Sequence, residues 1–123
     1  MELFASPGQY LYNLQTTSSS EAKRMWRRSI KEKWNCECAY CGSTENLTLD
    51  HVVPRSKGGA DETKNVVCCC QTCNHDKGHT PWQQWYNSQY FFDPDRYQKI
   101  LDWMEPEKPK NLYAYGSRRN NAT

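Results

Sequence analysis

The stretch from residue 38 to residue 78 decides the fold. It begins C-A-Y-C-G (38–42), continues L-D-H-V-V-P-R-S-K-G-G (49–59) and ends N-V-V-C-C-C-Q-T-C-N-H-D-K-G (65–78). A segment this short rarely buries enough apolar surface to be stable without a disulfide or a metal. It also holds two Cys-x-x-Cys pairs that enclose an Asp-His step: Cys38/Cys41, Cys70/Cys73 and Asp50-His51.

The cysteines favour a metal site over disulfides. The chain has 7 cysteines, and an odd number fits poorly with a closed set of disulfides. Four thiolates from two Cys-x-x-Cys turns suit one closed, tetrahedral zinc site. We therefore predict a structural Zn²⁺ bound by Cys38, Cys41, Cys70 and Cys73. By spacing alone, either Cys36 or Cys69 can replace one of these ligands.

Composition limits the class of protein. A chain of 123 residues is one small domain or a core with extensions. Its net charge of +2 does not by itself indicate a nucleic-acid partner, so the local distribution of charge matters more. No stretch has the length and apolarity of a membrane span, and the first residues do not resemble a secretory signal. We expect no membrane partner and a reducing, cytoplasmic compartment.

Local patterns predict a ββα unit within residues 36–79. Residues 47–51 alternate like a short strand, and residues 54–62 contain Gly58-Gly59 and should form a loop. Residues 65–68 should form a second, antiparallel strand. A short helix should then begin at Cys73 and end near Gly78. The predicted class is α+β, with this core flanked by helices on both sides.

The core is flanked by two segments, residues 1–35 before it and residues 80–123 after it. Residues 1–17 show no clear periodicity and are expected to form an extended arm. Residues 20–34 should form a helix with an apolar stripe, and four of its cations share another face: Arg24, Arg27, Arg28 and Lys31. That face is either a solvated surface or a contact with the phosphate backbone of DNA. Two further helices should begin at Pro81 and after Asp93, the first with Trp82, Trp85, Tyr86 and Tyr90 on one face. The tail from Glu105 is expected to be mobile.

The Asp-His step can support phosphodiester hydrolysis. A neutral imidazole can accept a proton from water near pH 7, and a neighbouring carboxylate can bind Mg²⁺. Because adjacent residues of a strand point to opposite faces, a bend or the strand end must bring both side chains to one cleft. Cations nearby can neutralise phosphate charge: Arg55, Lys57 and Lys77.

Taken together, these motifs resemble the HNH endonuclease family. The matching residues are C-A-Y-C-G, L-D-H-V-V-P-R-S-K-G-G, Asn65 and C-Q-T-C-N-H-D-K-G, in the order and spacing of the family. The resemblance implies a ββα-metal (His-Me finger) fold and cleavage of double-stranded DNA with a single catalytic metal ion. It also implies 5′-phosphate and 3′-hydroxyl products.

The resemblance assigns a role to each motif position. It implies that His51 is the general base, that Asp50 and Asn74 bind the catalytic ion, and that Asn65 holds the loop and orients His51. The chain departs from members that have a third ligand, a histidine, four residues after Asn74, because Gly78 stands there. Two oxygen ligands favour Mg²⁺ or Mn²⁺. His79 as an extra ligand is an alternative.

The sequence thus predicts an endonuclease that nicks one strand per active site. It acts as a monomer or a homodimer in a bacterial or phage-infected cell. A site-specific homing role and a phage packaging or restriction role both fit. The alternative from another class is a zinc-stabilised DNA-binding module without catalysis, in which Asp50-His51 is incidental.

Overall fold

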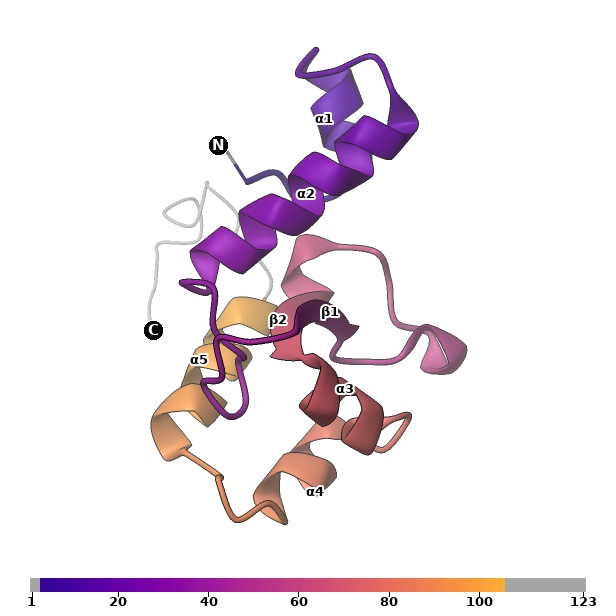
Figure 1. Cartoon of the computed structure of the whole chain (residues 1–123). Coiled ribbons are helices and arrows are strands. Elements are labelled where there is room, and N and C mark those ends of the chain that lie inside the picture. Colours follow the sequence, from indigo (N-terminus) through magenta and orange to yellow (C-terminus); the bar gives the residue numbers. More distant parts are fainter. Residues whose placement is uncertain (1–2, 106–123) are drawn as a thin grey trace, which may run out of the picture.

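The computed structural model describes residues 3–105 of the chain. Its centre is a two-stranded antiparallel sheet in which β1 (Leu47–His51) pairs with β2 (Val66–Cys70). The helix α3 (Gln71–Lys77) follows β2 directly and packs against both strands. This order of strand, loop, strand and helix confirms the predicted ββα unit (Figure 1).

The two strands differ in burial. All five residues of β2 are buried, whereas in β1 only Asp50 is buried. β1 pairs with β2 alone, with His51 opposite Val66. On its other edge, the Leu49 and His51 carbonyls accept from side chains of α3. The loop between the strands contains two short 3₁₀ turns, η1 (Arg55–Lys57) and η2 (Thr63–Asn65). α3 begins two residues earlier than predicted because the Cys70 sulfur accepts a hydrogen bond from the backbone N–H of Cys73.

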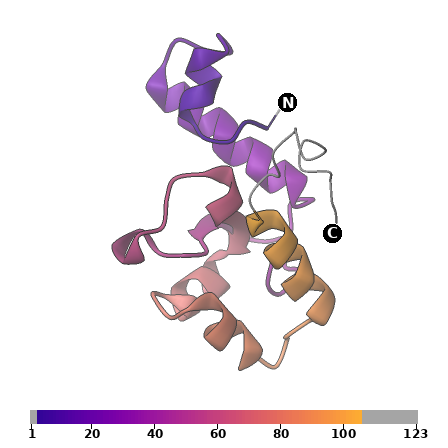
Figure 2. The same cartoon turned by 180° about the vertical axis from the view of Figure 1, so that it is seen from behind.

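The basic helix α2 (Ser19–Lys33) lies across the sheet and contacts both strands (Figures 1 and 2). The Ser18 hydroxyl accepts a hydrogen bond from the backbone N–H of Glu21, which fixes the start of the helix as an N-cap. The predicted apolar stripe is buried as expected, and it consists of Ala22, Trp26, Ile30 and Trp34.

The prediction of an extended arm before α2 is wrong. Residues Gly8–Tyr12 form a short helix, α1, which contacts α2. Tyr10 is buried and meets Phe4 edge-on at 4.7 Å between ring centroids. A helix of 5 residues is too short to show periodicity or to be stable alone, so packing on α2 must stabilise it.

The C-terminal helices α4 (Trp82–Asn87) and α5 (Pro94–Met104) complete the described chain. The Asp93 carboxylate accepts from the backbone N–H of Asp95 and caps α5. The prediction that Tyr90 shares the buried face of α4 is wrong, since Tyr90 is 98% exposed and lies beyond the helix end. Ser88 and Gln89 side chains donate to the Trp85 carbonyl and end α4 there.

No helix within residues 3–105 is both long and apolar enough to cross a membrane. The expected mobile tail after Glu105 lies outside the described residues.

Candidate metal centre and active site

Four sulfur atoms gather where the loop after α2 meets the start of α3. The Sγ atoms of Cys38, Cys41, Cys70 and Cys73 all lie within 4.8 Å of one another. The Cys41 and Cys70 sulfurs are 3.7 Å apart. A tetrahedral site with Zn–S bonds of about 2.3 Å has sulfurs about 3.8 Å apart, so the spacing matches. The cluster can hold a metal ion such as zinc.

The surrounding chain holds this cluster in place. The Arg96 guanidinium of α5 donates to the Cys38 carbonyl at 3.1 Å and to Glu37 at 3.0 Å. Burial raises the pKa of the Cys41 thiol to about 11. Four thiolates this close would repel one another strongly unless a cation neutralised them. Cys36 is exposed and lies outside the set, as do the buried Cys68 and Cys69.

His51 ends β1 and faces Asp61 from the following loop. The His51 Nε2 atom lies 2.6 Å from Asp61 Oδ1, and the histidine side chain is 28% exposed. This contact lowers the pKa of the Asp61 carboxyl group. Arg55 lies 4.0 Å from the other Asp61 oxygen. The contact holds the imidazole ring at the surface, where solvent and a substrate can reach it.

Asn65 holds the loop that follows His51. Its Oδ1 accepts from the backbone N–H of Val53 at 3.0 Å, and its Nδ2 donates to the carbonyls of Val53 and Ala60 at 3.0 and 3.1 Å. One amide therefore ties both ends of the loop together, using its donor and acceptor groups at once. This is the kind of contact that the resemblance implies for Asn65.

Gly59 lies against the hydrogen bonds between Asn65 and Val53, and we expect Gly59→Ala to disrupt them. A Cβ at position 59 would lie 1.7 Å from the Val53 carbonyl oxygen and 2.8 Å from Asn65 Nδ2. Backbone has to move, so the melting temperature should fall by several degrees, equivalent to roughly 1–3 kcal/mol. Gly8→Ala is the matched control, since nothing lies within 4 Å of a Cβ there. Equal melting temperatures for the two variants, measured by circular dichroism, would contradict the close packing.

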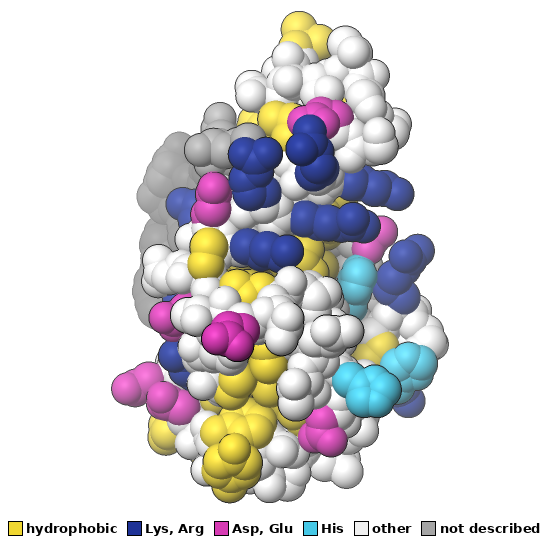
Figure 3. Space-filling view, in the orientation of Figure 1, with side chains coloured by type: hydrophobic (Ala, Val, Ile, Leu, Met, Phe, Trp, Pro, Cys, Tyr) yellow, Lys and Arg dark blue, Asp and Glu magenta, His cyan; other side chains and the backbone are white. Residues whose placement is uncertain are grey.

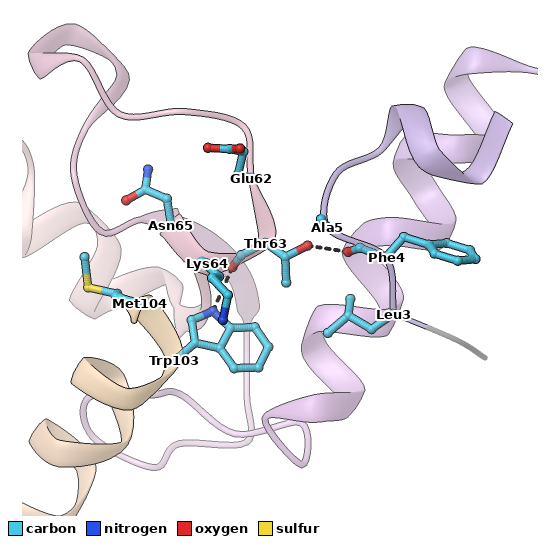
Figure 4. A pocket seen from close by; sticks show the side chains of 9 residues that line it. All are labelled: Leu3, Phe4, Ala5, Glu62, Thr63, Lys64, Asn65, Trp103 and Met104. Atoms are coloured by element: carbon cyan, nitrogen blue, oxygen red, sulfur yellow. Dashed lines mark hydrogen bonds between the residues drawn. The ribbon is translucent and has the colours of Figure 1, made fainter. Parts of the chain in front are cut away.

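The same loop is anchored from three sides through Thr63, and Figure 4 shows two of these contacts, with Phe4 and Trp103. The Thr63 hydroxyl donates to the Phe4 carbonyl at 2.5 Å and accepts from Trp26 Nε1 at 2.8 Å. Trp103 Nε1 donates to the Thr63 carbonyl at 2.8 Å. The N-terminal segment, α2 and α5 thus fix the segment between Asp61 and Asn65. The flanking helices therefore support the geometry around His51.

Asp50 points to the opposite face of β1 and is only 5% exposed. Its Oδ2 accepts from the Tyr40 hydroxyl at 2.9 Å, and the Lys77 ammonium lies 3.3 Å from Oδ1 and 3.2 Å from Oδ2. Burial raises the pKa of Asp50, although Lys77 and Tyr40 both act to lower it. The carboxylate is thus placed to face a cation, which here is the ammonium of Lys77.

Asn74 reaches β1 from α3. Its Nδ2 donates to the Leu49 carbonyl at 3.1 Å, next to Asp50 in the chain. An amide oxygen and a carboxylate are the hard ligands that Mg²⁺ and Mn²⁺ prefer. By donor chemistry these two side chains would suit a divalent ion, and a cation, the Lys77 ammonium, already lies beside Asp50. Gly78, which stands where the resemblance would allow a third ligand, ends α3.

A hollow of about 390 Å³ lies between α2 and β1, and His51 lines it. Figure 3 shows Lys and Arg side chains gathered over α2 on this face. The cations that line the hollow are Lys23, Arg27, Lys31 and Arg55. We call this hollow the cationic groove. A second hollow lies on the α3 side of β1; it shares Leu47 and Thr48 with the first and is lined by Asn74.

The predicted DNA-contacting cations are therefore distributed unevenly. Arg27, Lys31 and Arg55 line the groove, while Arg24 pairs with Glu21. Arg28 and Lys57 are exposed but do not line it. Lys77 is buried, with 1% exposure, and its ammonium faces Asp50 instead of solvent.

Three residues of the site were not predicted. Lys23 precedes Arg27 by four residues and Lys31 by eight, so helical spacing could have identified it. Asp61 is one of two acidic residues in the loop after His51, but no pattern indicates that it meets the imidazole. Tyr40 lies between two predicted zinc ligands, where its contact with Asp50 has no local signal.

A ββα unit with a histidine at the end of its first strand, and a cysteine cluster that can hold a metal ion, are consistent with a ββα-metal fold. Residues 38–87 match the family model described as HNH endonuclease. Similarity to named proteins points the same way. Over 65 residues the chain is 43% identical to the CRISPR-associated endonuclease Cas9 of Corynebacterium diphtheriae, a match that covers 50% of this chain and 6% of that protein.

A second relative comes from a prophage. The SPbeta prophage-derived protein YoqL of Bacillus subtilis, which bears the name of an HNH endonuclease, is 27% identical over 94 residues. This match covers 64% of the chain and 39% of the relative. The chain thus spans well under half the length of either curated relative. The similarities support a nuclease.

Proposed function

We propose that the chain is a metal-dependent endonuclease that hydrolyses double-stranded DNA. The observation that carries the proposal is the placement of His51, at the end of β1 within the cationic groove. Cations that line a groove attract the phosphate backbone without sequence preference. A phosphate held there would lie beside the His51 imidazole, which lines the groove.

In this proposal each residue has a distinct role. His51 accepts a proton from the water that attacks phosphorus, and Asp61 positions the imidazole. Asn65 keeps the loop closed behind His51. Asp50 and Asn74 hold the catalytic Mg²⁺ or Mn²⁺, which when bound neutralises phosphate charge and stabilises the leaving 3′ oxygen. Cys38, Cys41, Cys70 and Cys73 hold the structural Zn²⁺ that keeps β2 and α3 together.

A single site of this kind nicks one strand at a visit. Cutting both strands would need a homodimer or two visits by a monomer. We include a phage origin in the proposal because the Bacillus subtilis relative is prophage-derived. A homing role predicts cuts at one position of a long DNA, whereas a packaging or restriction role predicts cuts at many positions.

The test is cleavage of supercoiled plasmid and of bacterial genomic DNA by the zinc-loaded protein. We expect conversion of plasmid to the open-circular form with Mg²⁺ or Mn²⁺ and no conversion when neither ion is added. Mapping the ends on genomic DNA separates one cut position from many. Intact plasmid and intact genomic DNA with both ions would contradict the proposal and leave the binding-module alternative.

A further inference from the structure

We infer that the ammonium of Lys77 holds, in the DNA-free protein, the place on Asp50 that the catalytic ion takes. This inference rests on the proposed function, because it takes Asp50 to be a ligand of that ion. It adds a role for Lys77 that differs from a phosphate contact. The lysine is an internal cation that the metal ion has to displace.

The geometry around Asp50 supports this role. The Lys77 ammonium contacts both carboxylate oxygens, at 3.3 and 3.2 Å, and the Tyr40 hydroxyl contacts Oδ2 at 2.9 Å. The Lys77 side chain has no exposed surface, and that of Asp50 has 6%. Both oxygens are thus engaged, and bulk water does not screen the pair.

A divalent ion and this ammonium cannot share the carboxylate. Mg²⁺ needs oxygens at about 2.0–2.1 Å in near-octahedral order, with several waters kept. An ammonium about 3 Å from the same oxygens would occupy that space and repel the ion strongly in a buried site. Binding of the ion therefore requires Lys77 to leave Asp50.

The position of Lys77 in the fold allows it to leave. It is the last residue of α3, and Gly78 follows with a positive φ of 51° that ends the helix. Its ammonium also lies 3.4 Å from the His51 carbonyl oxygen. When it leaves Asp50, the ammonium can keep this carbonyl as a hydrogen-bond partner and turn toward a DNA phosphate. Because a phosphate contact would stabilise the displaced ammonium, DNA and the metal ion should each help the other to bind.

The inference predicts that Lys77→Met strengthens the binding of the metal ion and does not weaken it. Removing the competing cation should tighten Mn²⁺ binding to the DNA-free protein by at least about tenfold, because a buried carboxylate left without a partner favours an incoming cation. If Lys77 has only a structural role, Lys77→Met should bind Mn²⁺ as tightly as wild type or more weakly. The measurement is titration of zinc-loaded protein with Mn²⁺, in which electron paramagnetic resonance detects the free ion.

Two variants serve as controls. Lys33→Met makes the same change of charge at an exposed position of α2 and should leave Mn²⁺ binding within about twofold of wild type. The double variant Asp50→Asn/Lys77→Met removes the carboxylate as well and should lose the tightened binding. If Lys77→Met does not fold alone, Mn²⁺ should restore its circular dichroism and its melting transition.

The outcomes separate the inference from the proposed function. Wild-type cleavage with Mn²⁺, together with unchanged or weaker Mn²⁺ binding by Lys77→Met, overturns the inference alone. An unfolded Lys77→Met that Mn²⁺ does not restore overturns it as well. If wild type does not cleave plasmid or genomic DNA in Mn²⁺, the proposed function fails first, whatever Lys77→Met binds.

Discussion

Replacing His51 with alanine is expected to reduce DNA cleavage by roughly 10²- to 10⁴-fold, the usual contribution of a general base. The imidazole ends β1 within the cationic groove, and its Nε2 lies 2.6 Å from Asp61. No other histidine lines that groove among residues 3–105. The loss should appear in kcat, because the cations that bind phosphate remain in place.

The measurement is nicking of supercoiled plasmid under single-turnover conditions, with DNA affinity and zinc content determined on the same samples. His79→Ala is the matched control, since this histidine is exposed and does not line the groove. It should cleave within about threefold of wild type. Equal cleavage by wild type and His51→Ala would contradict the proposed mechanism. A large loss in His79→Ala would instead favour the alternative in which His79 is an additional ligand.

Removing one sulfur of the cluster is expected to unfold the core. Structural zinc supplies about 10–16 kcal/mol in small zinc domains, at least as much as the roughly 5–15 kcal/mol that stabilises a typical folded domain. Cys70 ends β2 and its sulfur caps α3, so Cys70→Ser should detach the helix that carries Asn74 and Lys77. We expect loss of bound zinc, of the cooperative melting transition and of cleavage together.

Cys36→Ser is the matched control, because Cys36 is exposed and lies outside the cluster. It should keep one zinc per chain, measured by atomic absorption, and the melting transition of wild type. A folded, zinc-loaded Cys70→Ser protein would show that another cysteine completes the site. Cys69, which spacing allows as a ligand, would then be the first candidate to replace.

Much of the fold was predictable because its determinants are local. The alternation over residues 47–51 predicted β1 with the observed bounds. The stripe at four-residue spacing predicted α2 to within one residue at each end. Spacing also favoured, among 7 cysteines, the four whose sulfur atoms lie together, although it left Cys36 and Cys69 as alternatives. These patterns depend on backbone periods and turn lengths that a short window of sequence contains.

Local patterns failed where long-range packing decides the structure. The short helix at Gly8–Tyr12 forms against α2, and Tyr90 leaves the buried face because side chains end α4 before it. The first outcome has no signal in the neighbouring residues, because it depends on a partner surface. The second comes from a local helix stop at Ser88 and Gln89, which the spacing of the aromatic residues does not reveal.

The sequence by itself determined the ββα order, the cysteine set and the motif positions of Asp50, His51, Asn65 and Asn74. Only the tertiary structure decided the partners of these groups. Asp61 meets His51 across 10 residues of loop, and Lys77 reaches Asp50 across 27. A motif specifies which side chains stand on an element. Folding decides which charges are buried together, because that depends on how distant segments close on one another.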